Sequence, residues 1–432
     1  EESTWFSRYG GDGYPWVGTL VFEGRVYDHI RHRARGGVWR YAMVKNMWKF
    51  DFARGHDFVA RDDWGRELAV PWKKLNLGAS IQQGDYNHRG EQGMFESVGF
   101  RVFRLAGVPA MHSAYVQFRV IDDAAEAAPG SQYDGDFWGV YLMLEQPDGQ
   151  FLDQHGLGDG NLYKMEGGGG ELNHLGSAGP ADGSDLRAFQ SGFGRDEAWW
   201  RSNLEVGSYL SYQAVVQAIH HYDICYDKNF FYYRHPDTRR WQVIPWDLDL
   251  TWAENMYDAG CGGVDRIKQR LIPGPTGFPA VWREWQNRIR EFRDLFWNGD
   301  EAWRLIDEQA GRLRGPATGP TLLDADRAQW DYNPRMTDSA YSSAGSSKAG
   351  AGRFYQWPGY PAGTVTRDFD GAVAIMKRYV GFRSTNMAAR ARALDALAED
   401  PDIPATPRIR YIGPEGHPLD RLRFAIDSYQ GV

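Results

Sequence analysis

The period of the hydrophobic pattern changes along this chain, and this change limits the folds that it can adopt. Apolar and polar residues alternate, as in half-buried strands, over residues 19–52. Residues 114–122 and 137–152 are also strand-like, and the second segment is apolar enough for a central strand. Further along, apolar residues recur at helical spacing over residues 203–222, 278–297 and 372–397. A sheet-forming part followed by a helix-forming part predicts a fold of the α+β class.

One helical segment interrupts the strand-like part. Residues 93–108 place Phe95, Val98 and Phe103 on one helical face, and Gly107 ends the pattern. We expect this helix to pack on the sheet as the main helix of a β-rich lobe.

These patterns divide the chain into four predicted units. They are a β-rich N-terminal lobe (1–150), a Gly-rich crossing with a loop at 165–185 (151–195), an α-rich C-terminal lobe (196–403) and the beginning of a β-like tail or linker (404–432). Within the third unit, the small-residue segment 332–364 is expected to be a surface loop.

Length and charge exclude several classes of protein. With 432 residues, 42% of them hydrophobic, the chain can bury a large core and more readily two lobes. A formal charge of -8 argues against a general nucleic-acid-binding protein, which needs an excess of Lys and Arg. No apolar run of about 18 residues or more occurs, so no transmembrane segment is predicted. Because the chain begins at Glu1, we expect a trimmed or mature form.

The predicted lobes resemble in arrangement the protein-kinase-like enzymes, which clamp a nucleotide between a β-rich and an α-rich lobe. Such chemistry uses a Lys on a strand of the first lobe and a Glu on its helix. Lys49 lies in a strand-like segment, Lys45 lies four residues earlier on the same predicted strand face, and Glu96 lies on the helix. We expect an ion pair between Lys49 and Glu96 that presents the ammonium to phosphate groups. Alternatively, Lys45 and Lys49 are solvated strand residues.

Acidic and amide side chains gather in "YDICYDKNFFYY" and "IPWDLDLTW". Asp223 and Asn229 precede one predicted strand, and Asp247 and Asp249 follow the next strand. A hairpin would bring these groups to one divalent cation, since Mg²⁺ prefers oxygen ligands. The alternative, that such residues are turn formers and helix caps, accounts for Asp237 and can account for Asp227, but not for Asp247 and Asp249.

Two further features leave alternatives open. A basic segment could surround a triphosphate or be the solvated face of a sheet; its cations are Arg25, Arg31, Arg33, Arg35, Arg40, Lys45, Lys49 and Arg54. Cys225 and Cys261 could form one disulfide or remain two buried thiols.

Several segments resemble, in order and spacing, the CotH kinase family, named for spore coat protein H. They are "WKFDF", "KKLNL", "FESVGFRVFRLAGVPA", "WGVYLMLEQPDGQFL", "GNLYK" and "YDKNFFYY…WQVIPWDLDLTW". The resemblance covers roughly residues 25–300, and "IPWDLDLTW" with the upstream "NFFYY" is its most specific part. It implies a bilobal, atypical protein-kinase-like fold that binds ATP with Mg²⁺ or Mn²⁺ and phosphorylates proteins.

The resemblance also implies roles for individual residues. Asp223 would be the catalytic base, with Asp227 as the competing residue. Lys49, grouped with Lys45, would contact phosphate and pair with Glu96. The nucleotide's adenine would lie near the hinge around Glu145. The metal ligands would be Asn229 and Asp247, with Asp249 as a further ligand or a competitor of Asp247.

The leading functional prediction is transfer of the γ-phosphoryl of ATP to Ser or Thr of a secreted or envelope protein. The same fold could instead transfer AMP or another group. A different class of prediction is a non-catalytic surface protein, because fungal members of the family are described as adhesins. The family resemblance favours an extracellular or cell-envelope location.

Overall fold

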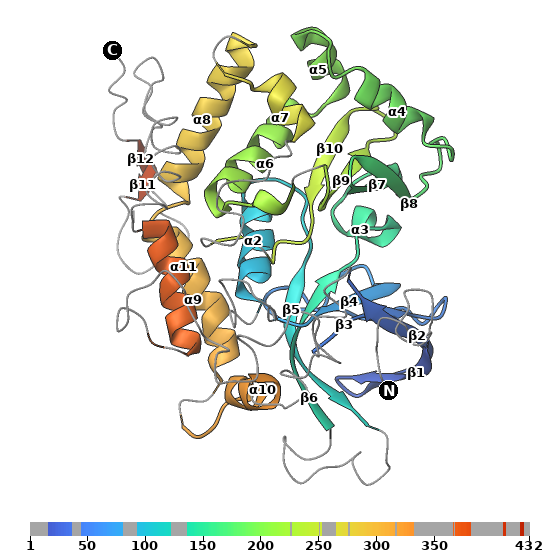
Figure 1. Ribbon diagram of the computed structural model, residues 1–432, viewed down its shortest axis with the longest axis vertical. Coiled ribbons are helices and arrows are strands. Elements are labelled where there is room, and N and C mark those ends of the chain that lie inside the picture. Colours follow the sequence, from blue (N-terminus) through green and yellow to red (C-terminus); the bar gives the residue numbers. More distant parts are fainter. Residues whose placement is uncertain are drawn as a thin grey trace.

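The computed structural model describes residues 16–36, 45–80, 93–121, 136–224, 227–249, 251–252, 265–274, 277–315, 318–331, 366, 368–381, 409–411 and 424–426. Within these residues it has two main antiparallel sheets and a set of helices, so the predicted α+β class is confirmed (Figure 1).

The first sheet has six antiparallel strands in the order β1-β2-β3-β4-β6-β5. Their bounds are β1 (Trp16–Phe22), β2 (Arg25–Arg35), β3 (Met47–Asp51), β4 (Lys74–Gly78), β5 (Ser113–Val120) and β6 (Asp136–Glu145). The strands predicted within residues 19–52 and 114–122 are confirmed. The strand predicted over 137–152 is shorter, because Asp148 accepts hydrogen bonds from the N–H groups of Gln150 and Phe151 and begins helix α3 (Gly149–Gln154).

The predicted helix of this part is α2 (Met94–Leu105), which lies centrally in the molecule beside β5 (Figure 1). Ten of its residues are buried, because α2 contacts the sheet on one side and the helices α6 (Val206–Ile219) and α9 (Glu301–Arg314) on the other. The opposite face of the sheet covers a separate cluster around Phe50, Phe58 and Trp72. The six-stranded sheet therefore separates two apolar cores.

One strand of this sheet was not among the predicted strands. β4 lies between β3 and α2 along the chain. The strand that directly precedes the helix in the sequence therefore carries Lys74 and Gly78, whereas Lys49 lies on the strand before it. The sequence of β4 is only five residues long and begins with Lys, which makes a buried strand hard to identify by periodicity.

The second sheet has four strands in the order β10-β9-β7-β8. They are β7 (Asn161–Glu166), β8 (Gly169–His174), β9 (Phe230–Arg234) and β10 (Trp241–Pro245). The prediction that residues 165–185 form a loop is wrong for β8, which pairs with β7 across a turn at Gly167 and Gly168. Both glycines have positive φ, 60° and 84°, so they form the turn and the remaining glycines extend as an edge strand.

Helices lie above the second sheet and to one side of it, and further helices lie beside α2 (Figure 1). They are α4 (Ser184–Ser191), α5 (Glu197–Asn203), α6, α7 (Arg266–Leu271), α8 (Pro279–Leu295), α9, α10 (Leu322–Asp331) and α11 (Phe369–Gly381). The helices predicted over 203–222 and 278–297 are confirmed, and α11 confirms the first part of 372–397. The rest of that segment and the predicted surface loop 332–364 lie outside the described residues.

Two further findings concern the tail and the membrane. The strand-like tail contains a short antiparallel pair, β11 (Ile409–Tyr411) and β12 (Phe424–Ile426), and its other residues lie outside the described part. Among the helices that the structure describes, none has the length and apolar character needed to cross a bilayer.

Candidate active site

A carboxylate, an amide and an ammonium meet where the chain enters β9. Asp223 lies on a short 3₁₀ turn (Tyr222–Ile224) that follows α6, and Asn229 precedes β9 with a φ of 61°. The Asn229 amide nitrogen donates to Asp223 Oδ2 (2.8 Å) and to the Asp223 carbonyl oxygen (3.0 Å). The Lys228 ammonium lies 2.8 Å from Asp223 Oδ1. Because Asn229 uses its NH₂ group for these bonds, its Oδ1 is the atom that can face a cation.

Asp247 reaches the same place from the other strand of the hairpin. Pro245 pairs with Phe230, and the Trp246 N–H donates to the Asn229 carbonyl oxygen (3.2 Å), which continues the register toward Asp247. The chain turns at Asp247, whose φ is 57°. Asp247 and Asp249 are both half-buried and flank the buried Leu248. The hairpin that the sequence predicted thus brings Asp223, Asn229 and Asp247 together.

The charges of this cluster influence one another. Burial raises the pKa of the Asp223 carboxyl, and the negative charge of Asp247 raises it further, while Lys228 and Asn229 oppose the change. Burial lowers the pKa of Lys228, but the carboxylates of Asp223 and Asp247 outweigh burial and hold this pKa above its usual value. The cluster therefore contains a carboxylate whose affinity for a proton exceeds that of an ordinary Asp, and a cation that stays charged.

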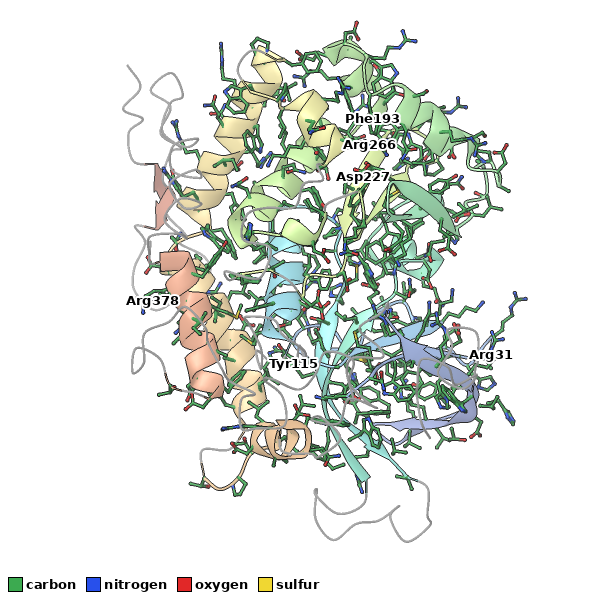
Figure 2. All side chains as sticks on the ribbon, viewed as in Figure 1. Arg31, Tyr115, Phe193, Asp227, Arg266 and Arg378 are labelled. Carbon is green, nitrogen blue, oxygen red and sulfur yellow. The ribbon has the colours of Figure 1, made fainter. Side chains whose placement is uncertain are left out.

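Asp227, the competing candidate for the base, is engaged elsewhere. Its carboxylate forms an ion pair with the Arg266 guanidinium at the beginning of α7, and the Arg266 N–H donates to Asp227 Oδ1 (3.4 Å). Arg266 also lies over the ring of Phe193, 5.6 Å from its centroid, and Figure 2 shows these three residues side by side. This arrangement favours a structural role for Asp227, which joins the β9 hairpin to α7.

One face of the six-stranded sheet carries several cations, and one of them contacts the residue next to Asp247. Opposite residues in antiparallel strands share a face, and Arg33 pairs with Lys49, which pairs with Asn76. Arg35, on the same face, places its guanidinium 5.3 Å from the centroid of the Trp246 ring, next to Asp247. Of the two interpretations of the basic segment, this contact favours a basic face that meets the acidic cluster.

Lys49 lies among other positive charges on this face. Burial and the neighbouring ammonium of Lys74 lower the pKa of Lys49 to about 8, with further contributions from Arg33 and Arg35, while Asp51 opposes them. Lys74 also lies near the segment after β6: burial raises the pKa of Asp148, and the charge of Lys74 opposes this change. A face with this excess of positive charge is suited to an anion such as a polyphosphate.

The predicted pair between Lys49 and Glu96 is not formed within the described part of the chain. Glu96 is buried on α2, and a Cβ placed on Gly78 would lie 3.4 Å from its Oε2 atom. Its carboxylate thus approaches β4 rather than the neighbouring strand that carries Lys49. The two charges lie apart because β4 lies between β3, which carries Lys49, and the strands β6 and β5, which are nearer to α2.

Lys45 lies apart from the basic face. It precedes β3 rather than sharing its strand, and its fully buried ammonium contacts Asp326 Oδ1 (2.7 Å) and the Val140 carbonyl oxygen (2.7 Å). Burial lowers the pKa of Lys45, and Asp326 opposes this change. The pair joins the first sheet to α10, so Lys45 is not part of the basic face.

Lys45→Met is expected to destabilise the protein by about 3–5 kcal/mol, because the buried Asp326 carboxylate would lose its ammonium partner. The Lys45→Met/Asp326→Leu double variant should recover most of this loss. Urea unfolding measures the free energy of unfolding of the single variant and of the double variant. A double variant that is as unstable as the sum of the single variants would contradict this interpretation of the pair.

Glu145 ends β6 and turns its side chain away from the basic face. It pairs with Leu75, the neighbour of Asn76, so its side chain leaves the sheet on the face opposite to Lys49. Its N–H donates to the His112 carbonyl oxygen (3.1 Å), and its carboxylate accepts from the His112 N–H (3.0 Å). An adenine contact through this side chain is therefore not favoured, although Gln146 and Asp148 follow it in the predicted hinge.

The matches to known proteins agree with the motifs. Residues 86–298 match the family model described as CotH kinase protein. This part of the chain is similar to the CotH kinase family. Comparison with curated proteins gives no match. The CotH kinase match includes α2, Glu145 and the whole Asp223–Asp247 cluster, whereas the basic face lies N-terminal to it.

Three residues of the CotH kinase region and its neighbouring sheet were not predicted from the sequence. Lys228 is adjacent to Asn229, and its position beside two candidate acids was an available signal. Lys74 begins the "KKLNL" segment, which was recognised only as part of the resemblance. Arg266 carries no local signal, because its contact with Asp227 spans 39 residues. Cys225 and Cys261 lie outside the described residues.

Proposed function

We propose that this chain is an ATP-dependent protein kinase that transfers the γ-phosphoryl group to Ser or Thr of a secreted or envelope protein. One observation carries the proposal: Asp223, Lys228, Asn229 and Asp247 form one cluster, and Arg35 from the basic face of the six-stranded sheet contacts Trp246, the neighbour of Asp247. Phosphoryl transfer requires an acceptor-orienting carboxylate, oxygen ligands for a divalent cation and cations for the phosphates.

The proposed role of each residue follows from the chemistry of its side chain. Asp223 accepts the proton of the acceptor hydroxyl, because burial and Asp247 raise its pKa toward the range in which a general base works well. Lys228 remains protonated beside it and stabilises negative charge on the transferred group.

A divalent cation fits the oxygen atoms of this cluster. The Asn229 amide oxygen and the Asp247 carboxylate would hold Mg²⁺ or Mn²⁺, with Asp249 as the further ligand. When bound, the cation neutralises charge on the phosphate groups. The donor set is oxygen only, which suits these hard cations.

The basic face is proposed to bind the phosphates. Lys49 and Lys74 stand on adjacent strands, β3 and β4, and Arg33 pairs with Lys49 from β2. We place the nucleotide between this face and the β9–β10 hairpin, with the segment after Glu145 as the hinge. This arrangement would be the kinase-like, bilobal form of the α+β fold.

The affinity for ATP is expected to fall above about pH 8. Lys49 has a pKa lowered to about 8, so it loses its positive charge as the pH rises through this value, and an anionic ligand then binds less tightly. Isothermal titration with ATP and Mg²⁺ between pH 7 and about 9.5 measures the effect. Lys49→Arg should remove the alkaline decline, since a guanidinium stays charged. An equal decline in Lys49→Arg would contradict the phosphate role of Lys49.

Intact-mass analysis tests the proposed reaction. The full chain is incubated with ATP, a divalent cation and a generic protein acceptor, with Asp247→Ala as the control. A gain of about 80 Da per site supports phosphoryl transfer. A gain of about 329 Da would mean AMP transfer and would overturn the kinase proposal while keeping the nucleotide site. No mass change, together with no ATP-dependent thermal shift, would favour a binding protein instead.

A further inference from the structure

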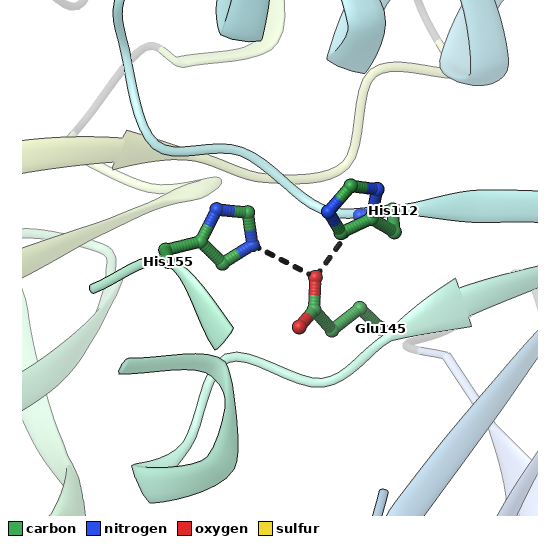
Figure 3. Close-up of side chains that lie close together, drawn as sticks. All are labelled: His112, Glu145 and His155. Atoms are coloured by element: carbon green, nitrogen blue, oxygen red, sulfur yellow. Dashed lines mark hydrogen bonds and ion pairs between the residues drawn. The ribbon is translucent and has the colours of Figure 1, made fainter. Parts of the chain in front are cut away.

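Two imidazoles and one carboxylate lie close together at the end of β6, where the predicted hinge begins (Figure 3). His112 directly precedes β5, Glu145 ends β6, and His155 follows the last turn of α3. One possible ligand atom from each residue lies within 4.8 Å of the other two. His155 Nε2 is 3.0 Å from Glu145 Oε2, and the two imidazole rings stack with centroids 5.2 Å apart. The chain thus gathers three potential ligands from three separate segments.

The carboxylate of this cluster is buried and incompletely partnered. Glu145 is 1% exposed, and its Oε1 atom is buried without a hydrogen-bond donor in the described part of the chain. The side chains of His155 and His112 are 9% and 17% exposed, so the cluster is shielded but can be reached from solvent. A buried carboxylate oxygen without a donor is unfavourable, and a bound cation would offset its charge.

A second carboxylate orients one of the imidazoles. Asp63 Oδ2 lies 3.4 Å from His112 Nδ1, and Asp63 is itself held by an ion pair with Arg104 and by the Ser113 hydroxyl (3.2 Å). Metal-binding His residues commonly direct one ring nitrogen to such a carboxylate, which leaves the other nitrogen for the metal. In His112 that remaining atom is Nε2.

We propose that His112, Glu145 and His155 form a zinc-type site with one coordination position left for water. Two imidazole nitrogens and one carboxylate oxygen are a ligand set that suits Zn²⁺, whereas Mg²⁺ and Ca²⁺ prefer oxygen ligands alone. A bound ion would tie β5, β6 and α3 together at the connection between the six-stranded sheet and the rest of the chain. The site does not depend on the proposed phosphoryl transfer, since it uses none of the residues assigned to that reaction.

Zinc titration of the chelator-treated full chain tests this site. Isothermal titration with ZnCl₂ is done in excess Mg²⁺, which fills oxygen-only sites, and bound metal is measured by elemental analysis after gel filtration. We expect one Zn²⁺ per wild-type chain. His155→Gln and Glu145→Gln should bind Zn²⁺ about tenfold or more weakly. Glu145→Gln keeps the size of the side chain and an acceptor oxygen, so it separates loss of the ligand charge from loss of the fold.

The matched control is His174→Gln. His174 Nε2 also contacts a carboxylate, Asp159 Oδ1 (2.7 Å), and no second His joins the pair among the described residues. This variant should bind Zn²⁺ like the wild type. Circular dichroism verifies that each variant is folded, and the visible absorption of bound Co²⁺ reports directly on imidazole ligation. Wild-type protein that binds no Zn²⁺, or a folded Glu145→Gln variant with unchanged affinity, would overturn the proposal.

Discussion

Asp223→Asn is expected to lower kcat for phosphoryl transfer by about 100- to 10,000-fold, the usual contribution of a general base. ATP binding should persist, because Asn keeps the size of the side chain and the proposed metal ligands Asn229 and Asp247 are unchanged. Single-turnover measurements with ATP and an acceptor protein, together with an ATP titration, separate the two effects.

The matched control for this variant is Asp227→Asn. Asp227 pairs with Arg266, so its loss should reduce stability and leave most of the turnover. If Asp223→Asn retained turnover and Asp227→Asn lost it, the base would be Asp227.

The pH dependence of kcat offers a second check on Asp223. A carboxylate base works when it is deprotonated, so activity should fall as the pH decreases through the pKa of Asp223. Because burial raises this pKa, the acidic decline should lie above the value of about 3.9 for an ordinary Asp. A decline at or below that value would contradict the proposed environment of the base.

Asp247→Ala is expected to remove metal-dependent ATP binding. Loss of a charged ligand from a partly buried site costs about 2 kcal/mol or more, which corresponds to about 30-fold in Kd. The variant also removes the negative charge that raises the pKa of Asp223, so any residual activity should persist to lower pH. Isothermal titration with ATP, with and without Mg²⁺, measures the change in affinity.

Asp249→Ala is the matched control for the metal ligand. Asp249 lies two residues further along and is half-buried like Asp247. A smaller loss in Asp249→Ala than in Asp247→Ala would identify Asp247 as the principal ligand. Equal ATP affinity in the wild type and Asp247→Ala would overturn the metal assignment, and the reverse order of losses would transfer it to Asp249.

Most of the α+β fold could be predicted from periodicity. Strand β5 and helices α2 and α8 carry an apolar face that shows in the sequence, and α6 shows as a long apolar segment that is buried on most sides. The elements that were not predicted include the helix α9 and two short strands. β4 has five residues, four of them buried, and β8 is rich in glycine, so neither shows a clear alternation.

The acidic cluster could be predicted because its geometry is local. Asp223, Asn229 and Asp247 lie within 25 residues, and the antiparallel register of β9 and β10 brings both ends of the hairpin together. The expected partner of Lys49 could not be predicted in the same way. An inserted strand placed Gly78, and not Lys49, beside the Glu96 carboxylate.

The sequence by itself determined the strands, the helices and the hairpin that unites the acids, because these depend on side-chain period and on contacts between near neighbours. Only the tertiary structure decided which charges meet over long separations. Lys45 and Asp326, 281 residues apart, are paired inside the protein, and His112, Glu145 and His155 converge from three segments. Such contacts depend on how whole elements pack, and no periodicity along the chain records that packing.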